Sequence, residues 1–410
     1  MSIDNMIKSC IKYQRNQLIN TVQNKLLAET QNLLNNLPAL INKTFPIPAQ
    51  FRGKLPSDIA ELSRLLTNKR GERSLSYLGR PNFLSAYLHY FLPWNLYRLC
   101  LLLKDLDIKL SSDDTITDLG SGTLTFPAAL WIARPDLRTV PLEIFCIDRS
   151  SQALEAGKKF FDTLCAASST SAEVKGNLWK INLVRKDIDI RKSGVIHNAA
   201  GKSKLVSAVN LFNEIYERVP HSNTGALKQI AFDCAKMMHA QAAENTCLLT
   251  VEPGIPQSGR FISFLREALI ELGRPPAAPC THSEICPLGD NKNKKWCHFA
   301  HENFDPPKEL ARLSAAARLP KERLVYSYLL TNAAQNQTTQ AVRVISDTFP
   351  LPGGKTGCYG CSAQGLVLLT KDKHNKDKVK SGDLITDFID TNEQDAKSGA
   401  LIINLSKEKK

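Results

Sequence analysis

The sequence has no uninterrupted apolar run long enough to cross a lipid bilayer, which requires about 20 apolar residues. Its most apolar stretch, residues 83–103, is broken at four positions by His89, Pro93, Asn95 and Arg98. A stretch of this kind is typical of a buried helical segment. The first residues also lack the basic flank and apolar core of a secretory signal peptide. We therefore expect a cytoplasmic protein without a membrane partner.

Acidic residues are in deficit. The 410 residues include 53 Lys and Arg against 40 Asp and Glu, which gives a formal net charge of +13. This excess favours a polyanionic partner such as nucleic acid, because each neutralised phosphate releases a counterion. A soluble basic protein with no such partner is the alternative interpretation.

The hydrophobic pattern changes character along the chain. Residues 1–110 show helical periodicity and no motif with evident chemistry, so we expect a helical N-terminal region there. In residues 111–275, short apolar runs alternate with helical patterns, which predicts parallel strands, right-handed crossovers and a doubly wound α/β sheet. The runs expected as strands are Thr115–Leu119, Ile144–Asp148, Ile181–Val184, Val206–Phe212 and Cys247–Glu252.

The remaining chain divides into three further parts. Residues 276–305 hold three cysteines, three histidines and a lysine-rich turn, and are expected to form a cysteine-rich insert. β patterning returns in residues 306–385, which predicts a small β-rich part. The end of the chain, from Lys371, is rich in Lys and Asp, and residues 386–410 are expected to be a flexible tail.

A glycine motif follows the first expected strand. Asp118, Gly120, Ser121 and Gly122 form an acid-x-Gly-x-Gly turn before a helix. Glycines let the backbone approach a ligand closely, and a carboxylate at the strand end can hold a polar group. A dinucleotide site usually has a third glycine three residues after the second, where this chain has Thr125. The motif therefore favours S-adenosylmethionine over NAD.

Two further carboxylates follow the next two strands. Asp148 ends the second strand, where a carboxylate can accept hydrogen bonds from both ribose hydroxyls. Asp187 follows the third strand and is expected near the adenine. Together with the glycine motif, this pattern resembles class I S-adenosylmethionine-dependent methyltransferases, which have a Rossmann-type fold. A plain strand–helix turn and structural roles for the carboxylates are the alternatives.

The fourth expected strand is followed by Asn213 and Glu214, where the donor's methyl group lies in this fold. The proline pair common in amino-group methyltransferases is absent, and so is the cysteine nucleophile of cytosine-C5 enzymes. Asn213 and Glu214 are therefore candidate substrate contacts, or else they cap the next helix. Methyl transfer itself stays open.

The insert contains Cys280, Cys286 and Cys297, and Cys358 and Cys361 follow in a glycine-rich stretch. Disulfides are rare in reducing compartments, so clustered cysteines indicate a metal site. Three neighbouring thiolates and a distant fourth suit an iron–sulfur cluster or zinc, and their spacing leaves both open. Unliganded cysteines in a loop are the alternative.

Other residues of the insert extend these options. His282, His298 and His301 are candidate zinc ligands. Trp296 and the lysines before it (Lys292, Lys294 and Lys295) are candidates for stacking on RNA or facing its phosphates, or the lysines simply form a solvated charged loop.

Over roughly residues 75–385 the chain resembles the methyltransferase-like family of small-ribosomal-subunit proteins, which includes mitochondrial ribosome assembly factors and bacterial relatives. The matching motifs are Asp118–Gly122, Val251–Gly254, Ala278–His282, Cys286–Leu288, Trp296–Phe299, and Cys361 with Gly365.

The resemblance implies a 4Fe–4S cluster on Cys280, Cys286, Cys297 and Cys361, with Cys358 as a rival fourth ligand. It also implies binding to small-subunit rRNA during assembly. An active rRNA methyltransferase is the alternative function, and a zinc-stabilised RNA-binding protein is a weaker one.

Overall fold

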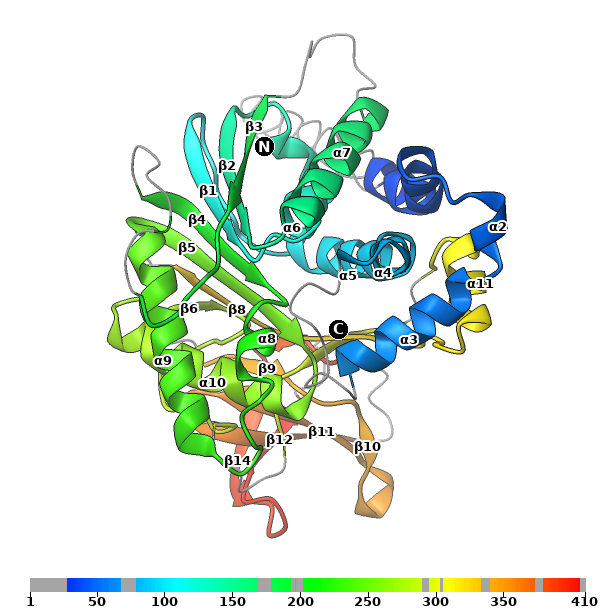
Figure 1. The fold of residues 1–410 in the computed structure, drawn as a ribbon. Helices are drawn as coiled ribbons and strands as arrows, with labels where there is room; N and C mark the ends of the chain where they lie inside the picture. Colours follow the sequence, from blue (N-terminus) through cyan, green and yellow to red (C-terminus); the bar gives the residue numbers. More distant parts are fainter. Residues whose placement is uncertain are drawn as a thin grey trace, which may run out of the picture.

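The computed structural model describes residues 28–67, 79–168, 178–192, 196, 202–289, 295–302, 305–332, 340–372 and 379–405. Within these ranges two sheets organise the chain, one of eight strands and one of seven (Figure 1). Lys292 and Lys294 of the predicted RNA-facing turn lie outside the described residues.

The first sheet has the strand order β3-β2-β1-β4-β5-β8-β6, with β7 paired to β8. Its first five strands are parallel: β1 (Asp114–Leu119), β2 (Leu142–Asp148), β3 (Trp179–Arg185), β4 (Ser203–Val209) and β5 (Ala242–Pro253). The strand β8 (Leu324–Asn332) runs antiparallel to β5. This doubly wound order with β1 near its centre confirms the Rossmann-type class I methyltransferase fold.

Helices cover both faces of this sheet (Figure 1). On one face pack α5 (Leu92–Leu103), α6 (Thr125–Ala133) and α7 (Ser151–Ser168), and their apolar side chains share one core cluster. On the other face, α8 (Phe212–Tyr216), α9 (Thr224–Gln241) and α10 (Pro256–Glu271) form a second cluster. Burial on both faces explains why the parallel strands read as continuous apolar runs.

The N-terminal region is helical wherever the structure describes it. Residues 28–44 form a helix. The elements that follow it are α2 (Ala49–Arg52), α3 (Leu55–Thr67), α4 (Pro81–Ala86) and the π-helix η3 (Tyr87–Phe91), which runs directly into α5. No helix among the described residues combines the length and the apolar content needed to span a bilayer.

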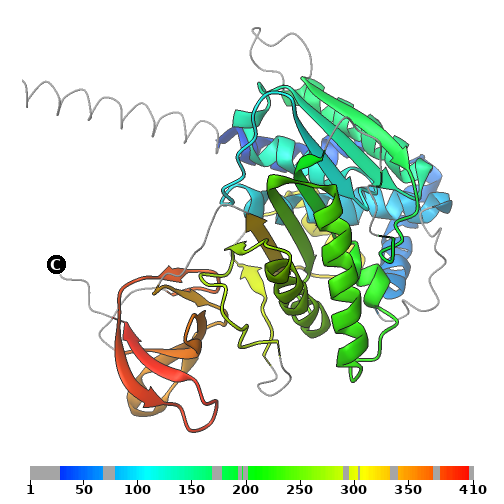
Figure 2. The same cartoon turned by 90° about the vertical axis from the view of Figure 1, so that its left-hand side faces the viewer.

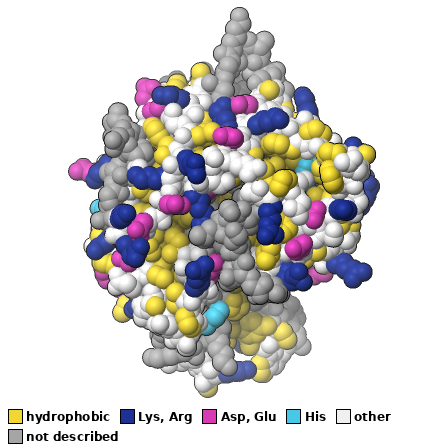
Figure 3. Space-filling model, in the orientation of Figure 1, with side chains coloured by type: hydrophobic (Ala, Val, Ile, Leu, Met, Phe, Trp, Pro, Cys, Tyr) yellow, Lys and Arg dark blue, Asp and Glu magenta, His cyan; other side chains and the backbone are white. Residues whose placement is uncertain are grey.

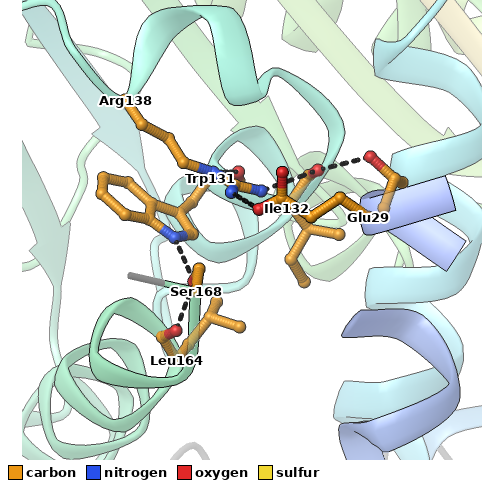
Figure 4. A network of polar contacts seen from close by, with 7 residues as sticks. Glu29, Trp131, Ile132, Arg138, Leu164 and Ser168 are labelled. Carbon is orange, nitrogen blue, oxygen red and sulfur yellow. Dashed lines mark hydrogen bonds and ion pairs between the residues drawn. The ribbon is translucent and has the colours of Figure 1, made fainter. Parts of the chain in front are cut away.

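A polar network joins the N-terminal helix to the sheet domain (Figure 4). Arg138 pairs with Glu29 of that helix, and its Nε donates to the carbonyl of Trp131 at 2.8 Å. The Trp131 indole Nε1 in turn donates to Ser168 Oγ at 2.8 Å. These bonds and the shared core make the N-terminal helices part of the first sheet's body.

The first sheet extends beyond the predicted boundary at residue 275. The strands β6 (Pro276–Ala278) and β7 (Phe299–His301) both pair with β8. The prediction that residues 324–332 belong to the C-terminal part is therefore wrong. An apolar run predicts a strand but not its partner, and β8 pairs with β5 across the whole insert.

The second sheet has the order β13-β9-β11-β12-β15-β14, with β10 paired to β11, and it forms a lobe beside the first (Figure 2). Its strands are β9 (Val342–Val344), β10 (Phe349–Pro350), β11 (Thr356–Ser362), β12 (Gly365–Lys371), β13 (Leu384–Ile385), β14 (Phe388–Gln394) and β15 (Leu401–Leu405). The helix α11 (Lys308–Ala316) and the short helices η4 (Pro135–Leu137) and η6 (Pro352–Gly354) complete the described elements.

The predicted flexible tail is wrong for residues 388–405, which form β14 and β15. Ile403 is fully buried and pairs with Leu369 of β12. The short apolar run Leu401–Leu405, which holds β15 in the sheet, was the sequence signal for order here.

Candidate functional site: a cleft beside a group of cysteines

A cleft of about 740 Å³ opens at the carboxyl ends of the parallel strands. Ligands bind at this end in doubly wound folds, and small-molecule pockets have volumes of roughly 300–1,000 Å³. All residues predicted at the cofactor site line the cleft, as do Asn213 and Glu214. These cofactor residues are Asp118, Gly120, Ser121, Gly122, Asp148 and Asp187.

The glycine loop after β1 requires its two glycines. Gly120 and Gly122 have φ angles of +68° and +51°, in the left-handed region that other residues avoid. A Cβ atom on Gly120 would also lie 2.6 Å from the Cδ1 atom of Leu211. The loop therefore presents backbone rather than side chains to the cleft.

Asp148 links the ends of β1 and β2. Its Oδ2 accepts a hydrogen bond from the backbone N–H of Gly122 at 2.9 Å, and its Oδ1 accepts one from that of Ser150 at 2.8 Å. The residue is half-buried. Each carboxylate oxygen has a second lone pair, so both can still accept from a ligand hydroxyl.

Asp118 lies beneath the glycine loop. It is 1% exposed, and its two oxygens accept from Ser121 Oγ at 2.5 Å and from Ser207 Oγ at 2.7 Å. Burial is the main cause that raises the pKa of this carboxyl to about 7. Both oxygens are occupied by protein hydroxyls, so Asp118 chiefly positions the loop and β4.

Glu252 at the end of β5 is a site residue to which the sequence analysis gave no role. It is fully buried and accepts from the backbone N–H groups of Phe212 and Asn213, at 2.9 and 3.0 Å, and from the Tyr216 hydroxyl at 3.2 Å. Burial raises the pKa of Glu252 to about 8. Glu252 thus fixes the start of α8 below the cleft.

The two residues expected near the methyl group differ in their contacts. The Oδ1 atom of Asn213 is buried and has no hydrogen-bond partner within the described ranges. Glu214 is engaged, since its Oε2 lies 3.2 Å from Nη2 of Arg149. Glu252, rather than the Asn213 side chain, caps α8, so Asn213 is left as a polar group available to a ligand in the cleft.

The N-terminal helices supply part of the cleft wall, contrary to the expectation that they carry no chemistry. Tyr87 of η3, with Asn95 and Arg98 of α5, lines the cleft. Arg98 donates to Asn95 Oδ1 at 2.8 Å and to Asn210 Oδ1 at 3.4 Å. The available sequence signal was the presence of Asn and Arg within an otherwise apolar helix.

Four cysteines lie near one another between the insert and the second sheet. Burial raises the pKa of Cys297, and the neighbouring thiols of Cys280, Cys286 and Cys361 raise it further. Burial likewise raises the pKa values of Cys280 and Cys361. Uncompensated thiolates would repel one another here, so this is a soft donor set suited to a cationic metal centre.

Cys358 is not part of this group. It is three residues from Cys361 on β11, and side chains separated by an odd number of residues face opposite sides of a strand. Cys358 packs in the core cluster of the second sheet with Val342 and Leu369. Cys361 instead packs in the cluster that contains Cys286 and Cys297.

Arg266 of α10 holds the insert against this group. It is 3% exposed, and its Nη2 atom donates to the carbonyls of His282 and Glu284 at 2.7 and 2.8 Å. Its positive charge lowers the pKa values of the surrounding thiols. The buried guanidinium therefore favours the negatively charged, thiolate form of the cysteines beside it.

The three histidines of the insert have different surroundings. His282 Nε2 lies 3.4 Å from Cys361 Sγ, whereas His301 bonds the Tyr326 hydroxyl at 2.9 Å and the His298 ring stacks on Trp296. Across the described residues, no three or more His, Cys, Asp or Glu side chains are arranged to hold a metal ion.

The four cysteines and most of the cleft fall within the part of the chain that matches a known protein family. The family model described as mitochondrial small ribosomal subunit Rsm22 matches residues 86–378, which include the four cysteines and all the cleft residues except Leu66, Thr67 and Gly79. No curated protein matches the chain.

Two solved structures illustrate the likeness to methyltransferases. Precorrin-6y C5,15-methyltransferase from Geobacter metallireducens has 12% identity and a TM-score of 0.29, with 58% of this chain and 84% of that chain covered. A chain of the fibrillarin/Nop5p complex has 12% identity and a TM-score of 0.29, with 58% and 82% covered.

Proposed function

Because the chain belongs to the Rsm22 family of mitochondrial small ribosomal subunit proteins, we propose that it is an assembly or translation factor of the small ribosomal subunit. In this proposal the protein binds the subunit's rRNA, and carries S-adenosylmethionine and a 4Fe–4S cluster. The family match is the observation that carries the proposal. The net charge of +13 supports a nucleic-acid partner.

The cleft is suited to S-adenosylmethionine. The backbone of Gly120 and Gly122 would lie along the donor, and Asp148 would accept hydrogen bonds from the ribose hydroxyls. Asp187 lines the same cleft and would face the adenine. The donor, when bound, supplies a methyl group on a positively charged sulfur.

The cysteine group is suited to an iron–sulfur cluster held by Cys280, Cys286, Cys297 and Cys361. Thiolates are soft ligands that suit both iron–sulfur clusters and zinc, and the family match is what favours the cluster. Bound there, it would add folding energy by joining the insert to β11.

An active rRNA methyltransferase is the second candidate function. The buried, unpartnered Oδ1 atom of Asn213 in the cleft favours it, because this atom can accept a hydrogen bond from a substrate N–H or O–H group. Mass spectrometry of rRNA nucleosides from cells with and without the protein separates the two functions. Loss of an assembly factor leaves every rRNA modification in place. Loss of an active methyltransferase leaves one modification missing.

Co-sedimentation with purified ribosomal subunits tests the main proposal. The anaerobically purified protein should sediment with small subunits and not with large ones, and rising salt should release it, because phosphate contacts are salt-sensitive. Equal sedimentation with both subunits, or with neither, would overturn the proposal. A cytoplasmic or other reducing compartment, as the sequence predicts, would keep the cysteines available for the cluster.

A further inference from the structure

A second cavity, of about 600 Å³, adjoins the donor cleft. The two share wall residues that include Phe91, Asn95, Arg98 and Lys321, so they lie side by side across a common wall. The second cavity extends from this shared wall towards the cysteine insert, where Trp296 and His298 line it. None of the predicted donor residues lines it, so it is a separate subsite.

Its far wall is a rigid aromatic surface. The rings of Trp296 and His298 stack with centroids 4.7 Å apart and planes 22° from parallel. Trp296 Nε1 donates to the Gly254 carbonyl at 3.1 Å, and a Cβ atom on Gly259 would lie 2.8 Å from the Trp296 side chain. The missing side chain at Gly259 permits this close packing, and the Gly254 carbonyl holds the indole N–H, so the indole is in place before any ligand binds.

The shared wall carries positive charge. Neither Arg98 nor Lys321 forms an ion pair with a carboxylate among the described residues, and the Nε atom of Arg98 is buried without a hydrogen-bond partner. Their charges lie close together, since Arg98 adds to burial in lowering the pKa of Lys321.

Neighbouring groups leave this charge largely unopposed. Glu252 is the carboxyl group whose charge acts on Arg98, and its pKa is raised to about 8, so it is mostly neutral at pH 7. Arg323, also in the wall, differs because it pairs with Glu302 and Asp347 at 2.9 Å each. An anionic group is therefore the natural partner of Arg98 and Lys321.

We propose that this cavity binds one unstacked nucleotide of single-stranded RNA, with its base against Trp296 and His298 and its phosphate beside Arg98 and Lys321. The proposal rests on the function proposed above and names the part of the RNA that the site takes. Every base has an aromatic face, so stacking on such a wall is tolerant of sequence. Because the two cavities share a wall, the adjoining nucleotide would lie beside the donor cleft.

The test uses the whole protein with its metal content intact and an eight-residue oligouridine as probe. His298→Ala removes half of the stacked wall and should weaken binding by roughly five- to a hundredfold, the range for lost base stacking. A plot of log affinity against log salt has a negative slope, and Lys321→Met should reduce its magnitude by about 0.7. This is the change expected for the loss of one phosphate contact on single-stranded RNA. The matched control is Lys109→Met, an exposed lysine just before β1.

Two measurements keep the result interpretable. Iron content and S-adenosylmethionine affinity of His298→Ala should equal those of the unchanged protein, which shows that the cluster and the donor cleft survive. Oligouridine affinity that is the same in all three variants would overturn the proposal. Binding of an acidic peptide in place of oligouridine would also overturn the proposal and indicate a protein partner.

Failure of the subsite and failure of the proposed function are distinguishable. If the unchanged protein does not sediment with small subunits, the ribosomal function fails whether or not oligouridine binds. If it sediments and the variants bind oligouridine normally, only the subsite fails.

Discussion

The backbone N–H of Gly122 donates a 2.9 Å hydrogen bond to Oδ2 of Asp148, so the loop after β1 and the carboxylate that ends β2 hold each other in place. The donor cleft is therefore organised before a ligand enters it. Basic side chains lie scattered over the face of the molecule in Figure 3. Contacts of the proposed RNA partner with that face would accordingly be spread out.

Asp148→Asn should weaken S-adenosylmethionine binding about tenfold or more. The amide keeps one acceptor but turns an NH₂ group towards a backbone N–H donor, and hydrogen bonds to a charged group contribute about 1.5–3 kcal/mol. Titration calorimetry measures the loss. Asp162→Asn, an exposed carboxylate on α7, is the matched control and should bind normally. Equal affinities of the two variants would exclude Asp148 from the donor site.

Gly157→Ala should destabilise the protein by about 1–3 kcal/mol, the usual cost of overpacking a core. A Cβ atom there would lie 2.3 Å from the backbone carbon of Thr123, so α7 and the glycine loop must separate. Urea denaturation gives the free energy of unfolding. Gly53→Ala, with no atom within 4 Å of the added Cβ and φ of −65°, is the control and should leave stability nearly unchanged. A Gly157→Ala protein as stable as this control would contradict the packing argument.

Stability should fall as pH rises from about 5 to 8, because Glu252 has a raised pKa of about 8 in the folded protein. Its unfolded pKa is near 4.3, so between the two values the native state binds more protons than the unfolded state. The free energy of unfolding then decreases with pH in that window. Glu252→Gln removes this titrating group and should make the dependence shallower, as urea midpoints at three pH values would show. Asp118, whose pKa is also raised, accounts for the slope that remains. An equally steep profile in the variant would assign the effect elsewhere.

The parallel strands were predictable because strands buried on both faces read as apolar runs. The runs at residues 115–119 and 247–252, for example, lie within β1 and β5, whose buried positions are continuous there. Partners were not predictable in this way. The strand β8 shows the same kind of run but pairs antiparallel with β5, although α10, β6 and β7 lie between the two in the sequence.

Roles of site residues could be predicted from the sequence where a motif requires a particular backbone conformation. Gly120 and Gly122 could be assigned because a left-handed turn requires glycine. Arg98 could not, since its position in an apolar helix predicts burial without showing that the helix closes a cleft built by distant strands. The choice between Cys358 and Cys361 depends on which face of β11 meets the insert, and spacing alone leaves it open.

Cys361→Ser should lose bound iron, whereas Cys358→Ser should retain it. The two cysteines belong to one strand, and serine is nearly the same size, so both variants impose a similar change on β11. They differ in surroundings: Cys361 lies with Cys286 and Cys297, and Cys358 lies in the apolar core of the second sheet. Iron and sulfide analysis after anaerobic purification, with the visible absorption of the cluster, measures the difference. Loss of iron from Cys358→Ser alone would mean that the opposite face of β11 holds the cluster. If the unchanged protein is itself colourless and contains zinc, and both variants are colourless too, the site holds zinc rather than a cluster. The donor-cleft proposal does not depend on this outcome.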